Sequence, residues 1–188
     1  LKAINLTGKP LSIVVVTTDK VYKDSGLKSK YKESDELGGS DPYSASKSAV
    51  ELLVSSWRET LHSREPQNGR KISISTARAG NVIGGGDFSS QRIIPDLVRS
   101  LIDQKPLHLR LPNAVRPWQH VLEPIIGYLL LAQYQYLSPH FKGEAFNFGP
   151  VDQQSITVKE LVYRAASFWG SQPEITLNSA GLHESEYL

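Results

Sequence analysis

Short apolar runs alternate with longer amphipathic stretches along this chain of 188 residues. Ile13–Thr17 is a continuous apolar run, typical of a parallel strand that is covered on both faces. Ile72–Ala77 and Ala145–Phe148 are further short strand-like segments, and Leu107–Leu111 alternates apolar and polar positions. Strands that interleave with helical periods predict an α/β fold with parallel strands.

Segments whose apolar residues recur with helical spacing follow these strands. Ser40–Pro42 supplies an N-cap with proline at the first helical position, and the polar stretch Ser63–Lys71 ends the helix that begins there. One face of this helix carries Val50, Leu53, Val54, Trp57 and Leu61. Further helices are predicted for Pro95–Asp103, from about Glu123 to Tyr136, and from a capping box at Thr157–Glu160 to Gly170.

Composition places the chain among ordinary globular proteins. Its net charge of +2 is too small to indicate a nucleic-acid groove or a basic membrane patch. It has no cysteine, which excludes thiolate metal sites and is compatible with a reducing cytoplasm, and its five histidines show no ligand spacing. The longest apolar stretch, Ile125–Ala132, is far shorter than the ~20 residues of a membrane-spanning helix. We therefore expect a cytoplasmic protein with no metal, nucleic-acid or membrane partner.

Tyr43 and Lys47 are the first candidates for chemistry. They lie four residues apart at a predicted helix start, so they share one helix face. A phenol has a pKa of about 10, and a nearby ammonium in a partly buried site can lower such a pKa enough to make a general base. The spacing alone is a weak pattern, found on many exposed helices. The preceding strand ends in Thr17–Lys20, and ligands of open α/β sheets bind at the carboxyl ends of strands.

Together these features resemble the catalytic core of the short-chain dehydrogenase/reductase superfamily. Six segments, spanning Val14 to Pro150, occur in the order of its extended sugar-nucleotide branch and are most similar to members that dehydrate CDP-glucose: TTDKVY, DPYSASKSAVELLV, RAGNVIGGGDF, RIIPDLVRS, RPWQHVLEPIIGYLLLAQ and EAFNFGP. The resemblance implies a Rossmann-like, doubly wound parallel sheet, of which this chain carries the C-terminal half. It also implies part of a smaller α/β region that binds substrate.

The same resemblance predicts the domain organisation. Residues 1–79 would be the C-terminal half of the NAD-binding domain, 80–115 elements of the substrate domain, 116–149 a return to the first domain, and 150–188 the start of a C-terminal substrate region. Leu1–Pro10 is expected to be the helix before a central strand. The glycine-rich turn that holds the NAD pyrophosphate in this family does not occur in the sequence. We interpret the chain as an internal segment that is inactive alone and expect the full-length protein to be a homodimer or homotetramer, because relatives dimerise through helices like the one beginning at Pro42.

The resemblance implies a role for each residue at the strand end and helix start. Thr18 would orient the sugar hydroxyl beside Tyr43, which would take the proton of the 4-hydroxyl while a hydride passes to NAD. Lys47 would keep Tyr43 ionised and contact the nicotinamide ribose. Asp19 would protonate the departing 6-hydroxyl and Lys20 would remove the C5 proton, although related dehydratases typically carry glutamate at the second position. On an exposed loop, Asp19 and Lys20 would instead be a solvated surface pair.

Further site residues follow from the later motifs. Asn81 would contact the sugar or diphosphate of the substrate, and Arg92 and Arg116 are expected diphosphate partners because guanidinium forks match phosphate oxygens. Trp118 and His120 are interpreted as structural. The backbone near the nicotinamide would come from Ala79, Gly80 and Val82.

The implied activity is that of an NAD-dependent lyase that converts CDP-glucose to CDP-4-keto-6-deoxyglucose. Two alternatives stay open. An NAD-dependent sugar-nucleotide 4-epimerase would have the same fold, but epimerisation at C4 needs no acid such as Asp19 for a leaving hydroxyl. A non-catalytic binding or regulatory protein would not need to keep Thr18, Tyr43 and Lys47 together.

Overall fold

The computed structural model describes residues 10–24, 30–63, 72–138, 141–150 and 156–177. The chain divides into two compact units. The first comprises Leu1–Gly80 and Leu122–Gly149, and the second comprises Asn81–Val121 and Pro150–Leu188. The helix expected over Leu1–Pro10 lies, apart from Pro10, outside the described residues.

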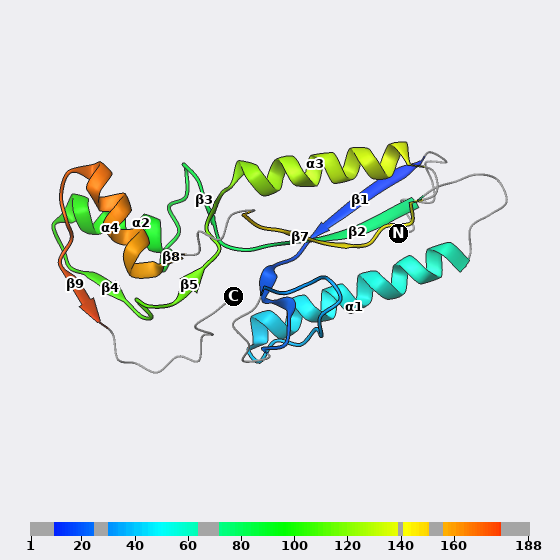
Figure 1. Cartoon of the computed structure of the whole chain (residues 1–188), viewed down its shortest axis with the longest axis horizontal. Coiled ribbons are helices and arrows are strands. Elements are labelled where there is room, and N and C mark those ends of the chain that lie inside the picture. The colour runs from blue at the N-terminus through cyan, green and yellow to red at the C-terminus, as the bar shows by residue number, and fades with distance from the viewer. Residues whose placement is uncertain (1–9, 25–29, 64–71, 139–140, 151–155, 178–188) are drawn as a thin grey trace. The chain divides into compact units, whose positions relative to one another are not determined.

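The first unit is built on a three-stranded parallel sheet in the order β1-β2-β7. β1 (Leu11–Val16) pairs with β2 (Ile72–Ala79), which also pairs with β7 (Ala145–Phe148). Figure 1 shows helix α1 (Pro42–Ser63) on one face of these strands and helix α3 (Leu122–Leu137) on the other. Parallel strands covered by helices on both faces confirm the predicted Rossmann-like α/β architecture.

The burial of β1 differs from the prediction. The sequence predicted a strand buried on both faces, but the residues of β1 are only partly buried and Val16 is 51% exposed. Within the described part of the chain, β1 pairs with β2 alone and is therefore an edge strand. A continuous apolar run shows that a strand is hydrophobic, but it does not distinguish a central strand from an edge strand.

β2 is the buried strand of this sheet, because it lies between β1 and β7. Two of its buried polar side chains have hydrogen-bond partners on the two helices. Ser75 donates to the amide oxygen of Gln135 on α3 (2.5 Å). Thr76 donates to the carboxylate of Glu51 on α1 (2.7 Å). These bonds compensate the cost of removing the hydroxyls from water.

Helix α1 begins as predicted. Asp41 caps it by accepting hydrogen bonds from the backbone N–H groups of Tyr43 (2.9 Å) and Ser44 (3.1 Å). Its predicted apolar face is only partly the buried face, because Val54 is buried while Leu53 is exposed. The buried residues of α1 are Ser44, Ser48, Glu51 and Val54.

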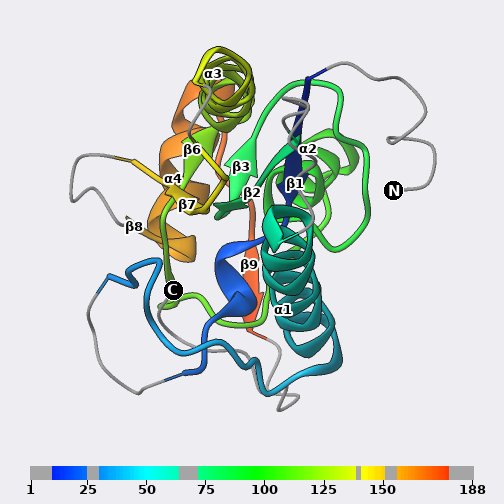
Figure 2. The ribbon, with the colours of Figure 1, turned by 90° about the vertical axis from the view of Figure 1, so that its right-hand side faces the viewer.

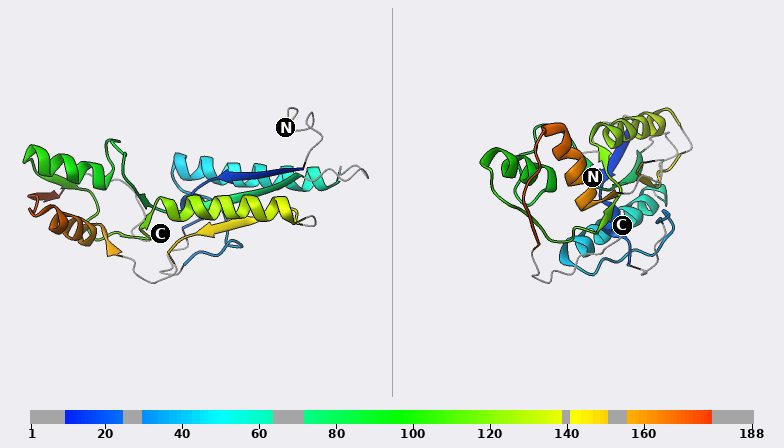
Figure 3. Two further views of the ribbon diagram at one scale, coloured as in Figure 1. Left: turned by 90° about the horizontal axis from the view of Figure 1, so that it is seen from above. Right: turned by 60° about the vertical axis from the view of Figure 1, so that its left-hand side comes forward.

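The second unit packs helices α2 (Ile93–Asp103) and α4 (Val158–Trp169) side by side (Figure 3). Its hydrophobic core contains Leu97, Leu107, Leu109 and Val162. Short strands complete it: β3 (Val82–Ile83) pairs with β6 (Gln119–His120), β4 (Leu107–Leu109) with β9 (Ile175–Leu177), and β5 (Val115–Arg116) with β8 (Ile156–Thr157).

The predicted ends of α4 are confirmed. The hydroxyl oxygen of Thr157 accepts from the backbone N–H of Glu160 (3.1 Å), and Gly170 closes the helix with a left-handed φ of 86°. The carboxylate of Glu160 pairs with Arg164 at 2.6 Å. None of the helices in the described ranges has the length and apolar character needed to cross a membrane.

Candidate active site

Polar residues follow β1 directly and form a short 3-10 helix, η2 (Asp19–Val21). The Thr18 hydroxyl oxygen accepts from the backbone N–H of Lys20 (3.4 Å), and the hydroxyl donates to Oδ1 of Asp19 (3.1 Å). Thr18 is buried, and Asp19 and Lys20 are half-buried. This burial argues against a fully solvated surface pair at these two positions.

Tyr43 and Lys47 lie in the first turns of α1. The ammonium nitrogen of Lys47 is 5.8 Å from the centroid of the Tyr43 ring, which is within the range of a cation–π interaction. Tyr43 is 53% exposed, and Lys47 is half-buried. The Lys47 ammonium therefore lies near the Tyr43 ring, and the Tyr43 side chain stays accessible to a ligand.

The structure brings η2 against the start of α1 (Figure 2). The hydroxyl of Ser48 donates to the backbone carbonyl of Val21 (2.7 Å), which joins the two segments directly. The hydrogen bond from the Ser44 hydroxyl chiefly lowers the pKa of Asp41, and the positive charge of Lys20 lowers it further. The five residues predicted to be catalytic thus lie in two adjacent segments of the first unit.

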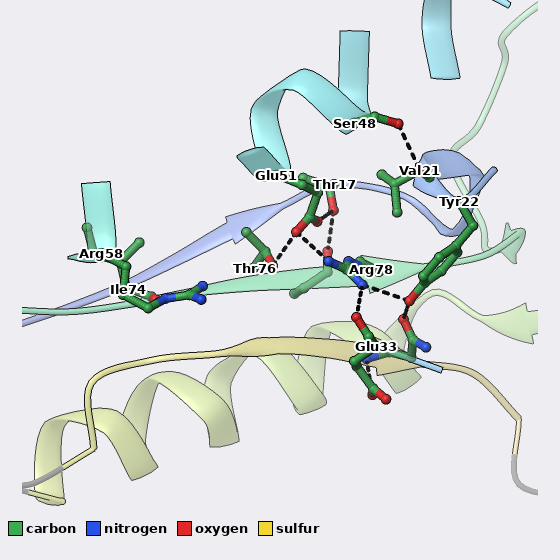
Figure 4. Close-up of polar contacts among 12 residues, drawn as sticks. Thr17, Val21, Tyr22, Glu33, Ser48, Glu51, Arg58, Ile74, Thr76 and Arg78 are labelled. Carbon is green, nitrogen blue, oxygen red and sulfur yellow. Dashed lines mark hydrogen bonds and ion pairs between the residues drawn. The ribbon is translucent and has the colours of Figure 1, made fainter. Parts of the chain in front are cut away.

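A buried ion pair joins strand β2 to helix α1 (Figure 4). Arg78 on β2 is 4% exposed and Glu51 on α1 is 3% exposed, and their Nη2 and Oε2 atoms are 2.8 Å apart. The Glu51 carboxylate also accepts from the hydroxyls of Thr17 (2.5 Å) and Thr76 (2.7 Å). Burial by itself raises the pKa of Glu51, but the hydrogen bonds from Arg78, Thr17 and Thr76 and the charge of Arg78 hold it below its ordinary value.

The same guanidinium reaches the segment that follows η2. Nη1 of Arg78 donates to the hydroxyl of Tyr22 (2.8 Å) and to the backbone carbonyl of Glu33 (3.1 Å). The Tyr22 hydroxyl donates in turn to Oδ1 of Asn147 (2.6 Å), and its ring stacks on Tyr31 with centroids 4.7 Å apart. Burial is the main reason that the pKa of Tyr22 is raised.

The sequence analysis missed Glu51, Arg78 and Tyr22. A signal was present, since Glu51 lies within the apolar part of a predicted helix and Arg78 follows a strand without charges. Charged residues are rarely buried unless they are paired, so opposite charges in two buried elements indicate a partner.

The predicted substrate contacts belong to the second unit. Arg116 is 6% exposed and donates to the backbone carbonyl of Val115 (3.0 Å). Arg92 is exposed at the N-cap position of α2, where its side chain makes no capping hydrogen bond. Asn81 is half-buried, and its backbone carbonyl accepts from the N–H of Gln119 (3.1 Å).

The remaining predicted positions lie around the end of β2. Ala79 is the last residue of β2, Gly80 follows it, and Val82 begins β3 and is exposed. Trp118 is half-buried and His120 is exposed. Among the residues that the structure describes, no group of three or more His, Asp or Glu side chains is arranged to hold a metal ion.

Residues 1–149 match the NAD dependent epimerase/dehydratase family. The CDP-glucose 4,6-dehydratase of Salmonella typhimurium is 36% identical over 189 residues, which cover 100% of this chain and 53% of that protein. A dTDP-glucose 4,6-dehydratase of Neisseria gonorrhoeae is 28% identical over 136 residues, or 71% of this chain and 35% of that protein. The chain thus spans about half, or less, of the length of these curated relatives.

Solved structures of both reaction types share the fold. The NAD complex of a dTDP-glucose 4,6-dehydratase from Bacillus anthracis aligns with a TM-score of 0.74 at 21% identity, over 94% of this chain and 51% of that one. A UDP-N-acetylglucosamine 4-epimerase from Methanobrevibacter ruminantium aligns with a TM-score of 0.76 at 18% identity, over 93% and 52%. Because dehydratases and epimerases align equally well, this likeness shows the fold and not the reaction.

Proposed function

The chain belongs to the NAD dependent epimerase/dehydratase family, and we propose on that basis that it is the catalytic segment of a sugar-nucleotide 4,6-dehydratase that acts on CDP-glucose. The observation that carries this proposal is the packing of η2, with Asp19 and Lys20, against the helix start that holds Tyr43 and Lys47. An acid and a base beside a tyrosine–lysine pair suit an elimination that follows an oxidation. The identity to the Salmonella protein supports CDP-glucose as the substrate.

Tyr43 and Lys47 suit the oxidation at C4. In this proposal Tyr43 takes the proton of the 4-hydroxyl, and Thr18 orients that hydroxyl. The ammonium of Lys47 is a donor that fits ribose hydroxyls, and the accessible oxygen of Tyr43 can accept from one. These residues and the backbone of Ala79, Gly80 and Val82 would hold NAD. When bound, NAD would accept the hydride from C4 and later return it to C6.

Asp19 and Lys20 suit the elimination of water. A ketone at C4 makes the C5 proton acidic, and Lys20 would remove that proton as the C5–C6 double bond forms. Protonated Asp19 would give its proton to the 6-hydroxyl, which leaves as water. Lys20 would then return the proton to C5. The proton that Tyr43 took from the 4-hydroxyl would pass to solvent and Asp19 would regain one, so the net change is the loss of one water from the substrate.

The second unit would bind the nucleotide end of the substrate. Arg92 and Asn81 are the proposed contacts to the diphosphate and sugar, and Arg92 is exposed and therefore accessible to a ligand. Arg116 is proposed as a further diphosphate partner, although it is only 6% exposed. We also propose that the full-length protein is a homodimer or homotetramer.

Incubating the full-length protein with NAD and CDP-glucose tests the proposed reaction. We expect a 4-keto-6-deoxy sugar nucleotide, identified by mass spectrometry and NMR. A Tyr43→Phe variant removes the proposed base and should lower kcat by about 10²–10⁴-fold with little change in KM. Tyr136→Phe, on an exposed position of α3, is the matched control and should behave like the parent protein.

Other products would contradict this proposal in different ways. A C4 epimer of CDP-glucose would identify the protein as an epimerase of the same fold. Turnover of dTDP-glucose but not of CDP-glucose would overturn the nucleotide assignment. Full activity of Tyr43→Phe would show that Tyr43 is not the catalytic base.

A further inference from the structure

We propose that Arg78 is a positioning residue that fixes the segment carrying Asp19 and Lys20 against the helix carrying Tyr43 and Lys47. Its guanidinium would do so by holding Glu51 of α1 and Tyr22, next to η2, at the same time. This inference rests on the proposed dehydratase function, because it assigns a task to residues that flank the reacting groups. None of the network residues is proposed to touch the substrate.

The first half of this connection fixes helix α1. Glu51 lies one helical turn after Lys47, and both oxygens of its carboxylate are engaged. Thr17 at the end of β1 holds one oxygen, while Thr76 and Arg78 of β2 hold the other. The carboxylate therefore joins one point of α1 to two strands of the sheet. A buried charge pair of this kind is costly to break, which keeps the helix at one place.

The second half fixes the segment after β1. Tyr22 lies two residues after Lys20, and its hydroxyl accepts from Arg78 at 2.8 Å while it donates to Asn147 at 2.6 Å. The guanidinium also lies over the Tyr22 ring, with its central carbon 5.1 Å from the ring centroid. Figure 4 shows Arg78 between Glu51 and Tyr22. A single planar group thus bridges the helix and the strand-end segment.

The fork of an arginine is needed for this arrangement. Nη2 binds Glu51 while Nη1 binds Tyr22 and the carbonyl of Glu33, so two nitrogens point to two segments. A lysine carries the same charge on one nitrogen and cannot span both contacts in the same way. Because displacement of a catalytic group by about 1 Å can cost about 10²-fold in rate, the loss of one contact should appear in kcat more than in binding.

Two variants of the NAD-loaded, full-length protein test the inference. Tyr22→Phe removes only the hydroxyl that Arg78 holds, and Arg78→Lys keeps the charge but loses the fork. We expect kcat on CDP-glucose to fall about 10-fold to 100-fold in both, with KM changed less than about twofold. Hydrogen–deuterium exchange of the backbone amides of residues 19–24 should rise in both variants, because this segment loses its anchor.

Tyr31→Phe is the matched control. It makes the same chemical change on the ring that stacks against Tyr22, and its hydroxyl has no hydrogen-bond partner in the described ranges. It should leave both kcat and the exchange of residues 19–24 at parent values. If Arg78→Lys fails to fold, the comparison of Tyr22→Phe with Tyr31→Phe decides the question.

The outcomes separate this inference from the proposed function. An active parent protein whose Tyr22→Phe variant keeps its kcat and its exchange pattern would overturn the positioning role alone. A variant that loses thermal stability but keeps kcat would also overturn it, since the network would then be merely structural. A folded parent protein without activity on CDP-glucose would overturn the dehydratase proposal, and faster exchange in Tyr22→Phe would still support the anchor.

Discussion

Glu51 is a carboxylate whose pKa the fold lowers, and this has a consequence for stability in acid. A pKa below the unfolded value of about 4.3 means that Glu51 stabilises the folded state fully above that pH. The contribution is lost as the pH falls through the folded pKa. We therefore expect Glu51→Gln to reduce the free energy of unfolding by about 3 kcal/mol at neutral pH, because Arg78 stays buried without its counter-charge.

The difference between the parent protein and Glu51→Gln should shrink in acid. Urea unfolding at about pH 7 and at about pH 3.5, which is below the unfolded pKa of about 4.3, measures this change. Glu59→Gln, at an exposed position of the same helix, controls for the loss of one carboxylate and should change little. A difference for Glu51→Gln that stays constant between the two pH values would contradict the lowered pKa.

Residues that act through local spacing could be predicted from the sequence. For the buried network, the sequence could indicate only that Glu51 and Arg78 need partners, and not that they pair with each other. Tyr43 and Lys47 are one helical turn apart, so their proximity follows from helix geometry. Glu51 and Arg78 are 27 positions apart on a helix and a strand, and their pairing depends on how these elements pack. Nothing in the local pattern around either residue specifies the other.

At the scale of single elements, the sequence predicted best those helix ends that a capping side chain marks. Asp41 and Thr157 supply side-chain caps, and the helices that follow them begin where the sequence indicated. β7 has the predicted bounds, Ala145–Phe148. The predicted strand Leu107–Leu111 ends at Leu109, and the two-residue strands of the second unit were not predicted because segments so short carry no period.

The N-cap of α4 should contribute to the stability of the protein. Thr157→Ala removes the oxygen that accepts the N–H of Glu160, which should destabilise the protein by about 1 kcal/mol. Ser167→Ala on the same helix is the control, because the Ser167 hydroxyl donates to the carbonyl of Arg164 and caps no free N–H. Chemical denaturation of both variants gives the comparison, and equal losses would argue against a specific capping role.

At the scale of the whole molecule, the apolar surface of α1 bears on assembly. Leu52 and Leu53 are 62% and 59% exposed on the helix that also carries Tyr43. If the proposed homodimer or homotetramer forms through this helix, Leu53→Glu should place a charge in the interface and weaken association at least tenfold, since burying an unpaired charge is strongly unfavourable. Analytical ultracentrifugation of the full-length protein measures this.

Ile102→Glu is the control for this substitution. Ile102 is equally exposed but lies on α2, in the second unit. Association should be unchanged in this variant. Equal weakening by both substitutions would indicate a general effect on solubility, and no weakening by Leu53→Glu would exclude α1 as the contact surface.

The two units are interleaved along the chain, since the segments Leu1–Gly80, Asn81–Val121, Leu122–Gly149 and Pro150–Leu188 alternate between them. The backbone consequently passes from one unit to the other three times. During synthesis the sheet of the first unit stays incomplete until β7 has left the ribosome, by which time much of the second unit has already emerged. A protease that cut one of the three connections would still leave the two units joined by the other two, as long as the segments of each unit stay packed together.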